Sequence, residues 1–313
     1  MLIVGVIIVI LFILWIISGM IFAFFSTNRN GNMNKIIGAY EATGDIPKLI
    51  AEQRKITHQK ISKEFEIKNR DGINLHGYLI CARKPSNVYV FYSHGYRSQD
   101  GAMEFGPLLK MWEAHDYNFF LVDHRAHGKS GGKYISYGIY ESEDNMEWLD
   151  FMIKTFGKDI EIIIEGQSMG AGTVLMMSGK KLPSQVRFLI ADCGYTCFFD
   201  VAQKAFSFFG SRLLLESANL YLSIVHGVDM KKAKPIDAVK YATKPILFTH
   251  GARDPIVPVE MGRANYEACT SEKSLHIFPY AEHTTAPIQC PEEYMSYVDE
   301  FIDKYMGGIT ENG

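Results

Sequence analysis

From Glu64 onward, short apolar runs rich in Ile, Val, Phe and Tyr alternate with amphipathic segments. This alternation is typical of a mostly parallel sheet, in which buried strands are joined by crossover helices. We expect strands near residues 65–69, 74–81, 88–93, 118–123, 161–165, 187–191, 245–249 and 274–278, and helices near 103–114, 140–155, 169–180, 259–268 and 291–305. The roughly 240 residues from 64 to 306 suit one α/β domain.

One segment interrupts this alternation. Residues 195–234 are rich in Phe and Leu and contain no obvious strand. We interpret them as a helical insertion between two strands, placed as a lid over a site at the strand ends. The alternative is that these apolar side chains form only the ordinary packing of the inserted helices.

The N-terminal segment carries a different signal. Leu2 to Phe25 is a run of 24 residues without a charged side chain, which as a helix rising ~1.5 Å per residue can span ~30 Å of hydrocarbon. A cleaved signal peptide needs a basic start, a shorter apolar stretch and a small-residue cleavage site. Residues 1–25 are therefore predicted to be a retained, single-pass transmembrane anchor. Arg29 and Lys35 follow the run and no basic residue precedes it, which favours a cytoplasmic catalytic domain.

The segments on either side of the α/β domain are also predicted from the sequence. We expect a linker and surface helical connection over 26–63, which would leave the domain independent of the anchor, and a tail over 307–313.

The composition excludes some functions. With 32 Lys+Arg against 35 Asp+Glu, the chain has no surplus of positive charge for binding nucleic acid. Five cysteines without a paired zinc-site spacing indicate reduced thiols rather than a metal site.

The pattern Gly-x-Ser-x-Gly occurs twice, at 128–132 and at 166–170. A nucleophilic serine on this pattern needs a strand that runs directly into a sharp turn, followed by a helix that begins with small residues. The second copy meets this requirement, because the expected strand 161–165 precedes it and small residues follow it. The first copy lies beyond its strand and continues into a loop. We predict Ser168 as the nucleophile, against the alternative that it only caps the following helix.

A serine hydroxyl needs a base to accept its proton, and histidine is the usual one at neutral pH. His283 follows the last expected strand in a polar loop, at the edge of the sheet where strand C-termini gather and ligands bind. We predict His283 as the base. Four other histidines flank strand ends but fit a loop-shaping role: His94, His124, His127 and His250.

The third member of such a site is a carboxylate that orients the imidazole. Asp254 lies just beyond the expected strand 245–249, and its rival Asp192 ends an earlier strand. Asp254 is favoured because it stands between the serine and the histidine along the chain. The plain alternative is an aspartate that shapes the turn ahead of Pro255.

These motifs together resemble the serine-hydrolase branch of the α/β-hydrolase superfamily over residues 64–306. The matching segments are His94-Gly95-Tyr96, Asp123-x-Arg125-x-x-Gly128-x-Ser130, Gly166-Gln167-Ser168-Met169-Gly170, Gly251-x-x-Asp254-x-x-Val257-Pro258 and the late His283. Within the superfamily the chain is most similar to membrane-anchored bacterial hydrolases of the esterase, lipase or prolyl-oligopeptidase type.

The resemblance implies an α/β-hydrolase fold with an eight-stranded, mostly parallel sheet. It also implies an oxyanion hole formed by the backbone NH groups of Tyr96 and Met169, and a structural role for the loop 128–132. Glu282 departs from the pattern, since a small residue is more usual before the histidine.

We therefore expect a serine hydrolase that cleaves a carboxylic ester with an apolar or lipid-like acyl group, without a metal or an organic cofactor. A peptidase or thioesterase would use the same triad. A binding protein on an inactive hydrolase fold would usually lack a triad member, whereas all three are present. The sequence points to no protein partner, and nucleotide binding is disfavoured because Asp123 stands where a phosphate-binding loop requires Gly.

Overall fold

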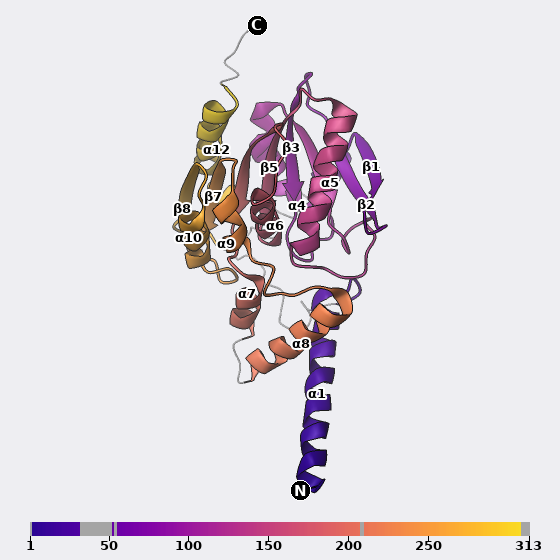
Figure 1. Ribbon diagram of the computed structural model, residues 1–313. Helices are drawn as coiled ribbons and strands as arrows, with labels where there is room; N and C mark the ends of the chain where they lie inside the picture. The colour runs from indigo at the N-terminus through magenta and orange to yellow at the C-terminus, as the bar shows by residue number, and fades with distance from the viewer. Residues whose placement is uncertain (1, 32–51, 53–54, 207–209, 308–313) are drawn as a thin grey trace.

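The computed structural model describes residues 2–31, 52, 55–206 and 210–307, and its centre is an eight-stranded sheet (Figure 1). The strands are β1 (Lys63–Lys68), β2 (Asn74–Ile80), β3 (Val88–Ser93), β4 (Asn118–Asp123), β5 (Glu161–Gln167), β6 (Val186–Asp192), β7 (Ile246–Gly251) and β8 (Lys273–Phe278). Their order in the sheet is β1-β2-β4-β3-β5-β6-β7-β8. The pairs β1–β2 and β2–β4 are antiparallel and the other neighbours are parallel. The expected eight-stranded, mostly parallel sheet is confirmed.

Helices cover both faces of the sheet. The larger ones are α4 (Gly101–Trp112), α5 (Ile139–Phe156), α6 (Met169–Ser178), α10 (Val259–Ala268) and α12 (Pro291–Tyr305). Short turns of helix occur at η1 (Glu113–His115), α9 (Pro235–Ala238), η2 (Val239–Tyr241) and α11 (Ala286–Gln289). Each of the five expected helices occurs, with ends that differ by a few residues at most.

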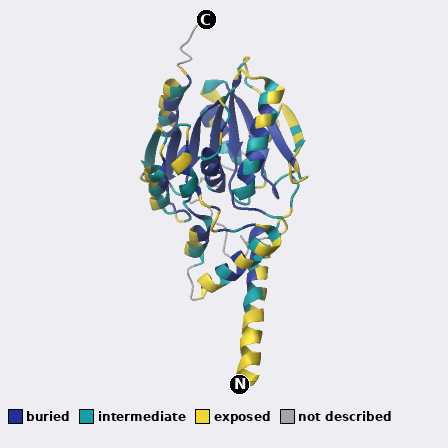
Figure 2. Ribbon diagram, in the orientation of Figure 1, coloured by how far each residue is buried: buried dark blue, intermediate teal, exposed yellow. Residues whose placement is uncertain are grey.

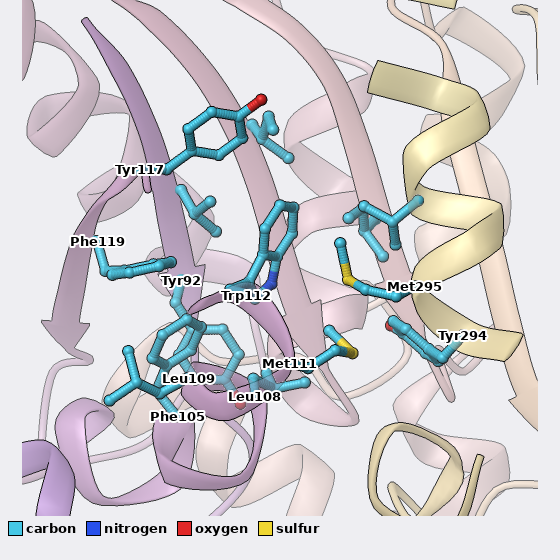
Figure 3. Close-up of a cluster of buried hydrophobic side chains, with 14 of the residues drawn as sticks. Tyr92, Phe105, Leu108, Leu109, Met111, Trp112, Tyr117, Phe119, Tyr294 and Met295 are labelled. Carbon is cyan, nitrogen blue, oxygen red and sulfur yellow. The ribbon is translucent and has the colours of Figure 1, made fainter. Parts of the chain in front are cut away.

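The strands divide their side chains between two apolar layers because successive residues of a strand point to opposite faces. In β5, Ile163 belongs to the layer under α4 and α12, whereas Ile162 and Ile164 belong to the layer under α5 and α6. The first layer is rich in aromatic side chains, among them Trp112 and Tyr294 (Figure 3). A sheet buried on both faces holds its strand ends rigidly, and those ends carry the candidate site.

The insertion between β6 and β7 contains α7 (Phe198–Ala205) and α8 (Ser211–His226). Both helices lie at the same end of the sheet as the helix α1 (Leu2–Thr27), which projects away from the domain (Figure 1). Residues 2–14 of α1 are all exposed, and burial begins only near the domain (Figure 2). Among the described residues, α1 is the one helix long and apolar enough to cross a membrane.

The start of the expected linker differs from the structure. Ser26 and Thr27 belong to α1 and are buried, and the chain as far as Gly31 is bonded to the domain. Most of the remaining linker falls outside the described residues, apart from a helical turn at 55–59. Gly307 follows α12, and the rest of the expected tail also lies outside the described residues.

Candidate active site

Ser168 occupies the sharp turn between β5 and α6. Its backbone has φ 55° and ψ −116°, a positive φ that non-glycine residues rarely adopt and that is found at nucleophile elbows. A Cβ on Gly170 would overlap the carbonyl oxygen of Ser93, and one on Gly166 would lie 2.5 Å from the carbonyl oxygen of Gly170. The two glycines of the motif are therefore required by the close approach of the turn to the neighbouring backbone.

Three loops at the C-terminal ends of β5, β7 and β8 bring the sequence-predicted residues together. His283 Nε2 lies 2.9 Å from Ser168 Oγ, and His283 Nδ1 lies 2.7 Å from Asp254 Oδ2. With the Nδ1 hydrogen donated to the carboxylate, Nε2 is the acceptor that faces the serine hydroxyl. His283 and Asp254 are buried, with 8% and 7% of their surfaces exposed, so little water competes for these bonds.

The Asp254 carboxylate is held in its charged form. Burial by itself would raise the pKa of this carboxyl, but hydrogen bonds from His250 and His283, together with the charge of His283, bring the pKa below its usual value. Its Oδ1 also accepts hydrogen bonds from the backbone NH groups of Ile256 and Val257, at 2.8 and 2.9 Å. A carboxylate that stays ionised can stabilise an imidazolium beside it.

Asp192, the rival carboxylate, points elsewhere. Its Oδ2 accepts a hydrogen bond from Gln167 Nε2 at 2.8 Å, and its Oδ1 accepts one from Thr249 Oγ1 at 2.9 Å. Burial raises the pKa of Asp192 despite these hydrogen bonds. The contact with His283 is made by Asp254, and Asp192 ties β5, β6 and β7 together beneath the site.

The backbone NH groups of Tyr96 and Met169 lie in the two turns that flank the serine. Gly95 approaches Ser168 closely, since a Cβ built on this glycine would lie 3.5 Å from the Cβ of Ser168. The NH of Gly95 donates to Glu104 Oε1 at 2.5 Å and that of Arg97 to His127 Nε2 at 3.1 Å. In the described part of the chain the NH groups of Tyr96 and Met169 have no acceptor. Free NH donors of this kind next to a serine hydroxyl have the arrangement of an oxyanion hole.

The other copy of the motif has a different environment. Ser130 is fully buried; its hydroxyl donates to the Asp123 carbonyl oxygen at 2.6 Å and accepts the His76 NH at 2.8 Å. Ser130 therefore braces the loop 128–132 against β2 and β4. Neither hydrogen bond of the Ser130 hydroxyl involves His283, whose ring bonds to Ser168 and Asp254.

The rings of His94 and His127 bond to the backbone, and the ring of His124 bonds to Ser93 Oγ at 2.9 Å. His94 Nδ1 donates to the Gly95 carbonyl oxygen at 2.8 Å while its Nε2 accepts the His124 NH at 3.0 Å. Burial lowers the pKa of His124 and of His127 well below the usual value. The imidazoles of His124 and His127 are thus neutral, and they lie in the loops around the Tyr96 turn.

One group of side chains has spacing that a metal ion could use, formed by Cys193, Asp254 and His283, with ligand atoms within 4.8 Å of one another. Two of its members are already bonded to each other. Burial raises the pKa of the Cys193 thiol well above its usual value, which opposes the thiolate that metal binding needs. Asp254 and His283 therefore fit a hydrogen-bonded pair beside Ser168 better than they fit a metal site shared with Cys193.

Arg97 is a residue of the site region that sequence reasoning missed. It has φ 57°, and its guanidinium donates to the carbonyl oxygens of Phe25 and Gly31, both at 2.6 Å, and to Tyr96 Oη at 3.1 Å. The last turn of α1 is thereby bonded to the residue beside Tyr96. No sequence motif signals this contact, because it joins residues about 70 positions apart.

The insertion packs against the residue that follows Ser168. Met169 packs in an apolar cluster with Phe199 of α7, Leu215 and Leu222 of α8, and Ala23 of α1. Nearby, the rings of Tyr137 and Phe198 stack with centroids 3.8 Å apart. Met169, which follows Ser168, therefore packs on the insertion and on the end of α1 through buried apolar side chains.

The sequence was compared with models of known protein families, and one of them matches the part of the chain that contains this site. The family model described as the prolyl oligopeptidase family matches residues 104–308, which contain Ser168, Asp254 and His283. The chain belongs to the prolyl oligopeptidase family. This family member is a serine hydrolase of the α/β-hydrolase superfamily, as the resemblance implied.

Individual relatives are more distant. This prolyl oligopeptidase family member is 29% identical to the uncharacterized protein YqkD of Bacillus subtilis over 252 residues, 79% of this chain and 81% of YqkD. An esterase of Pyrococcus furiosus has a similar structure, with a TM-score of 0.65, 24% identity, and coverage of 86% of this chain and 97% of the esterase. An acylaminoacyl peptidase of Pyrococcus horikoshii follows with a TM-score of 0.58, 17% identity, and coverage of 83% and 45%. At these identities the structural likeness shows the shared α/β-hydrolase fold.

Proposed function

We propose that this chain is a membrane-anchored esterase that hydrolyses carboxylic esters with an apolar acyl group, using Ser168, His283 and Asp254 as a catalytic triad. The observation that carries the proposal is the continuous hydrogen-bond chain from Ser168 Oγ through His283 to Asp254, with distances of 2.9 and 2.7 Å. Both bonds are short enough for proton transfer without rearrangement of the loops.

The reaction proceeds in two halves. His283 Nε2 accepts the Ser168 proton as Oγ attacks the ester carbonyl carbon, and the oxyanion that forms accepts hydrogen bonds from the NH groups of Tyr96 and Met169. His283 then donates the proton to the leaving alkoxide, which leaves an acyl-enzyme. In the second half His283 accepts a proton from water, hydroxide attacks the acyl-enzyme, and the proton returns to Ser168 Oγ as the carboxylic acid departs. Asp254 stays ionised and stabilises the imidazolium in both halves.

The preference for an apolar acyl group rests on the surface that surrounds Ser168. Tyr96, and Phe198 of α7, are partly buried and pack on the apolar cluster that contains Met169, the residue after Ser168. Acyl chains gain free energy by leaving water for such a surface, at about 25 cal/mol per Å² buried. A charged peptide or a sugar would lose hydration there without compensation.

The membrane anchor rests on α1. Its residues 2–14 carry no charge and are exposed along their whole length (Figure 2), so in water they would leave a large apolar surface uncovered. The hydrocarbon core of a bilayer would bury this surface away from water. Arg29 and Lys35 follow α1 in the sequence, which supports a cytoplasmic catalytic domain.

Peptidase activity is the second candidate, and the family membership favours it. The triad would cleave an amide by the same steps, with His283 donating its proton to an amine. A thioesterase reaction would differ only in its thiolate leaving group.

A substrate panel separates these activities. The full chain in detergent micelles is assayed with p-nitrophenyl esters of increasing acyl length, with aminoacyl p-nitroanilides and with acyl thioesters. We expect kcat/KM to rise with acyl length among the esters and to exceed the values for the amides and thioesters. Ser168→Ala should abolish all hydrolysis, and the exposed Ser184→Ala serves as the matched control. Faster cleavage of the anilides, with the same loss in Ser168→Ala, would replace the esterase assignment by peptidase.

A further inference from the structure

The helix α8 presents one apolar face to the domain and a second apolar face to the outside. Leu215 and Leu222 are buried in the cluster that contains Met169. On another side of the helix, Leu213, Leu220 and Ile224 are exposed by 65, 41 and 75%. The polar side chains are grouped separately, and Glu216 forms an ion pair with Lys231 at 2.7 Å. These three apolar side chains stay exposed although α1 packs against α8 beside them.

This helix is attached to α1 partway along the apolar run. Trp15 Nε1 donates to the Leu213 carbonyl oxygen at 2.7 Å, and Ser217 Oγ donates to the Trp15 carbonyl oxygen at 2.6 Å. Gly19 packs directly against Ser217 and Ala218, where a side chain would overlap the α8 backbone. Small residues at four-residue spacing, such as Gly19 and Ala23, let two helices approach closely. These contacts fix α8 beside the part of α1 between Trp15 and Gly19.

The position of Trp15 along α1 determines how deep α8 lies if α1 crosses a bilayer. From Leu2 to Trp15 a helix rises about 20 Å, whereas a hydrocarbon core is about 30 Å thick. Residues 2–14 alone are too short to span it, so the segment around Trp15 must also lie in hydrocarbon. Leu213, bonded to Trp15, then lies roughly 10 Å below the surface on the side of the domain.

We infer that α8 is embedded in the bilayer surface beside α1, with Leu213, Leu220 and Ile224 among the lipid acyl chains. The exposed Arg212 at the start of α8 has a side chain long enough to reach the headgroup level, and an amphipathic helix at this depth is a known mode of membrane binding. Leu215 and Leu222 on the opposite side of α8 share a buried cluster with Met169, so the bilayer then lies close to the proposed nucleophile next to Met169. Esters whose acyl chains already reside in the membrane become the substrates nearest to the site.

This inference rests on the proposed anchoring by α1, and the experiment separates the two. Nitroxide labels are placed by Ile7→Cys in α1, by Ile224→Cys in α8 and by Lys158→Cys at the opposite end of the sheet, in full chains with Cys81→Ser and Cys290→Ser to remove the accessible thiols. The proteins are reconstituted into phosphatidylcholine–phosphatidylglycerol vesicles. Power-saturation EPR then compares accessibility to oxygen, which concentrates in hydrocarbon, with accessibility to a water-soluble nickel chelate.

We expect the labels at Ile7 and Ile224 to favour oxygen over the chelate, and the label at Lys158 to favour the chelate. If the Ile224 label behaves like Lys158 while Ile7 favours oxygen, α8 lies in water and the inference is wrong although the anchor stands. If the Ile224 label is shielded from both reagents, protein covers this face and the inference is also wrong. If the Ile7 label favours the chelate, the anchoring itself fails.

Discussion

The Tyr96 hydroxyl donates a hydrogen bond to the backbone carbonyl oxygen of Ser26 at a distance of 2.6 Å. Tyr96 contributes one NH of the proposed oxyanion hole, and Ser26 lies in the last turn of α1. Arg97 strengthens the same contact through the carbonyl oxygens of Phe25 and Gly31. The helix α1 is therefore part of the support of the candidate site, whereas the polar stretch after residue 25 predicts a domain independent of it.

Removing the Arg97 guanidinium should lower turnover through the Tyr96 turn. Loss of one oxyanion donor typically costs on the order of 10²–10³ in kcat, and Arg97→Ala displaces such a donor without deleting it. We expect kcat to fall by roughly one to two orders of magnitude with little change in KM for a short ester. Arg263→Ala, at an exposed position of α10, is the control of equal charge change. An equal rise in KM with kcat unchanged would mean that Arg97 supports substrate binding instead.

The carboxylate of the triad can be assigned by a pair of isosteric changes. Asp254→Asn removes the acceptor of the His283 Nδ1 hydrogen and should lower kcat by up to roughly 10⁴-fold, as loss of a triad carboxylate does. Asp192→Asn changes a residue that bonds to Gln167 and Thr249 and should retain most of the activity. Steady-state kinetics with a soluble ester, after circular dichroism has shown that both variants are folded, make the comparison. Loss of activity in Asp192→Asn alone would contradict the assignment.

Glu165 should make the fold more stable in mild acid than in mild base. Burial, opposed by a hydrogen bond from Trp112 and assisted by the charge of Asp192, raises the pKa of Glu165 to about 8 from its ordinary 4.5. The folded state thus holds a proton that the unfolded chain releases above about pH 4.5, so stability falls as the pH rises from there through about 8. Glu165→Gln keeps an acceptor for Trp112 and should reduce this fall in Tm between pH 5 and 8. A Tm profile identical to that of the unchanged chain would show that Glu165 titrates normally.

Membrane orientation can be tested in cells that express the full chain. We expect protease added to intact cells to leave the catalytic domain uncut, because Arg29 and Lys35 favour the cytoplasmic side for the segment after α1. Permeabilised cells provide the control, in which the domain should be digested. Digestion in intact cells would place the domain outside. Recovery of a shortened, soluble form would identify residues 1–25 as a signal peptide.

The sheet and its helices could be predicted from the sequence because their signals are local. The β-branched run at 162–164 favours a strand by its own composition, and a turn into small residues follows from the glycines at 166 and 170. The approach of Asp254 to His283 follows from the same logic, since both stand at the C-terminal ends of neighbouring parallel strands.

The contacts of α1 could not be predicted in this way. The hydrogen bonds from Tyr96 and Arg97 end on backbone carbonyl oxygens, which every residue has, so the sequence carries no mark of the acceptor. Gly19 and Ala23 were the available signal for a packed helix face. In an apolar run they are outnumbered by large side chains, and the partner helix lies about 200 residues away.

The central claim is that Ser168 is the nucleophile, and its most direct test is the site of covalent modification. The full chain is treated with a fluorophosphonate, digested, and the adduct is mapped by mass spectrometry. We predict a single stoichiometric adduct on the peptide that contains Ser168, absent in Ser168→Ala and strongly slowed in His283→Ala. An adduct on Ser130, or labelling that persists in Ser168→Ala, would contradict the account.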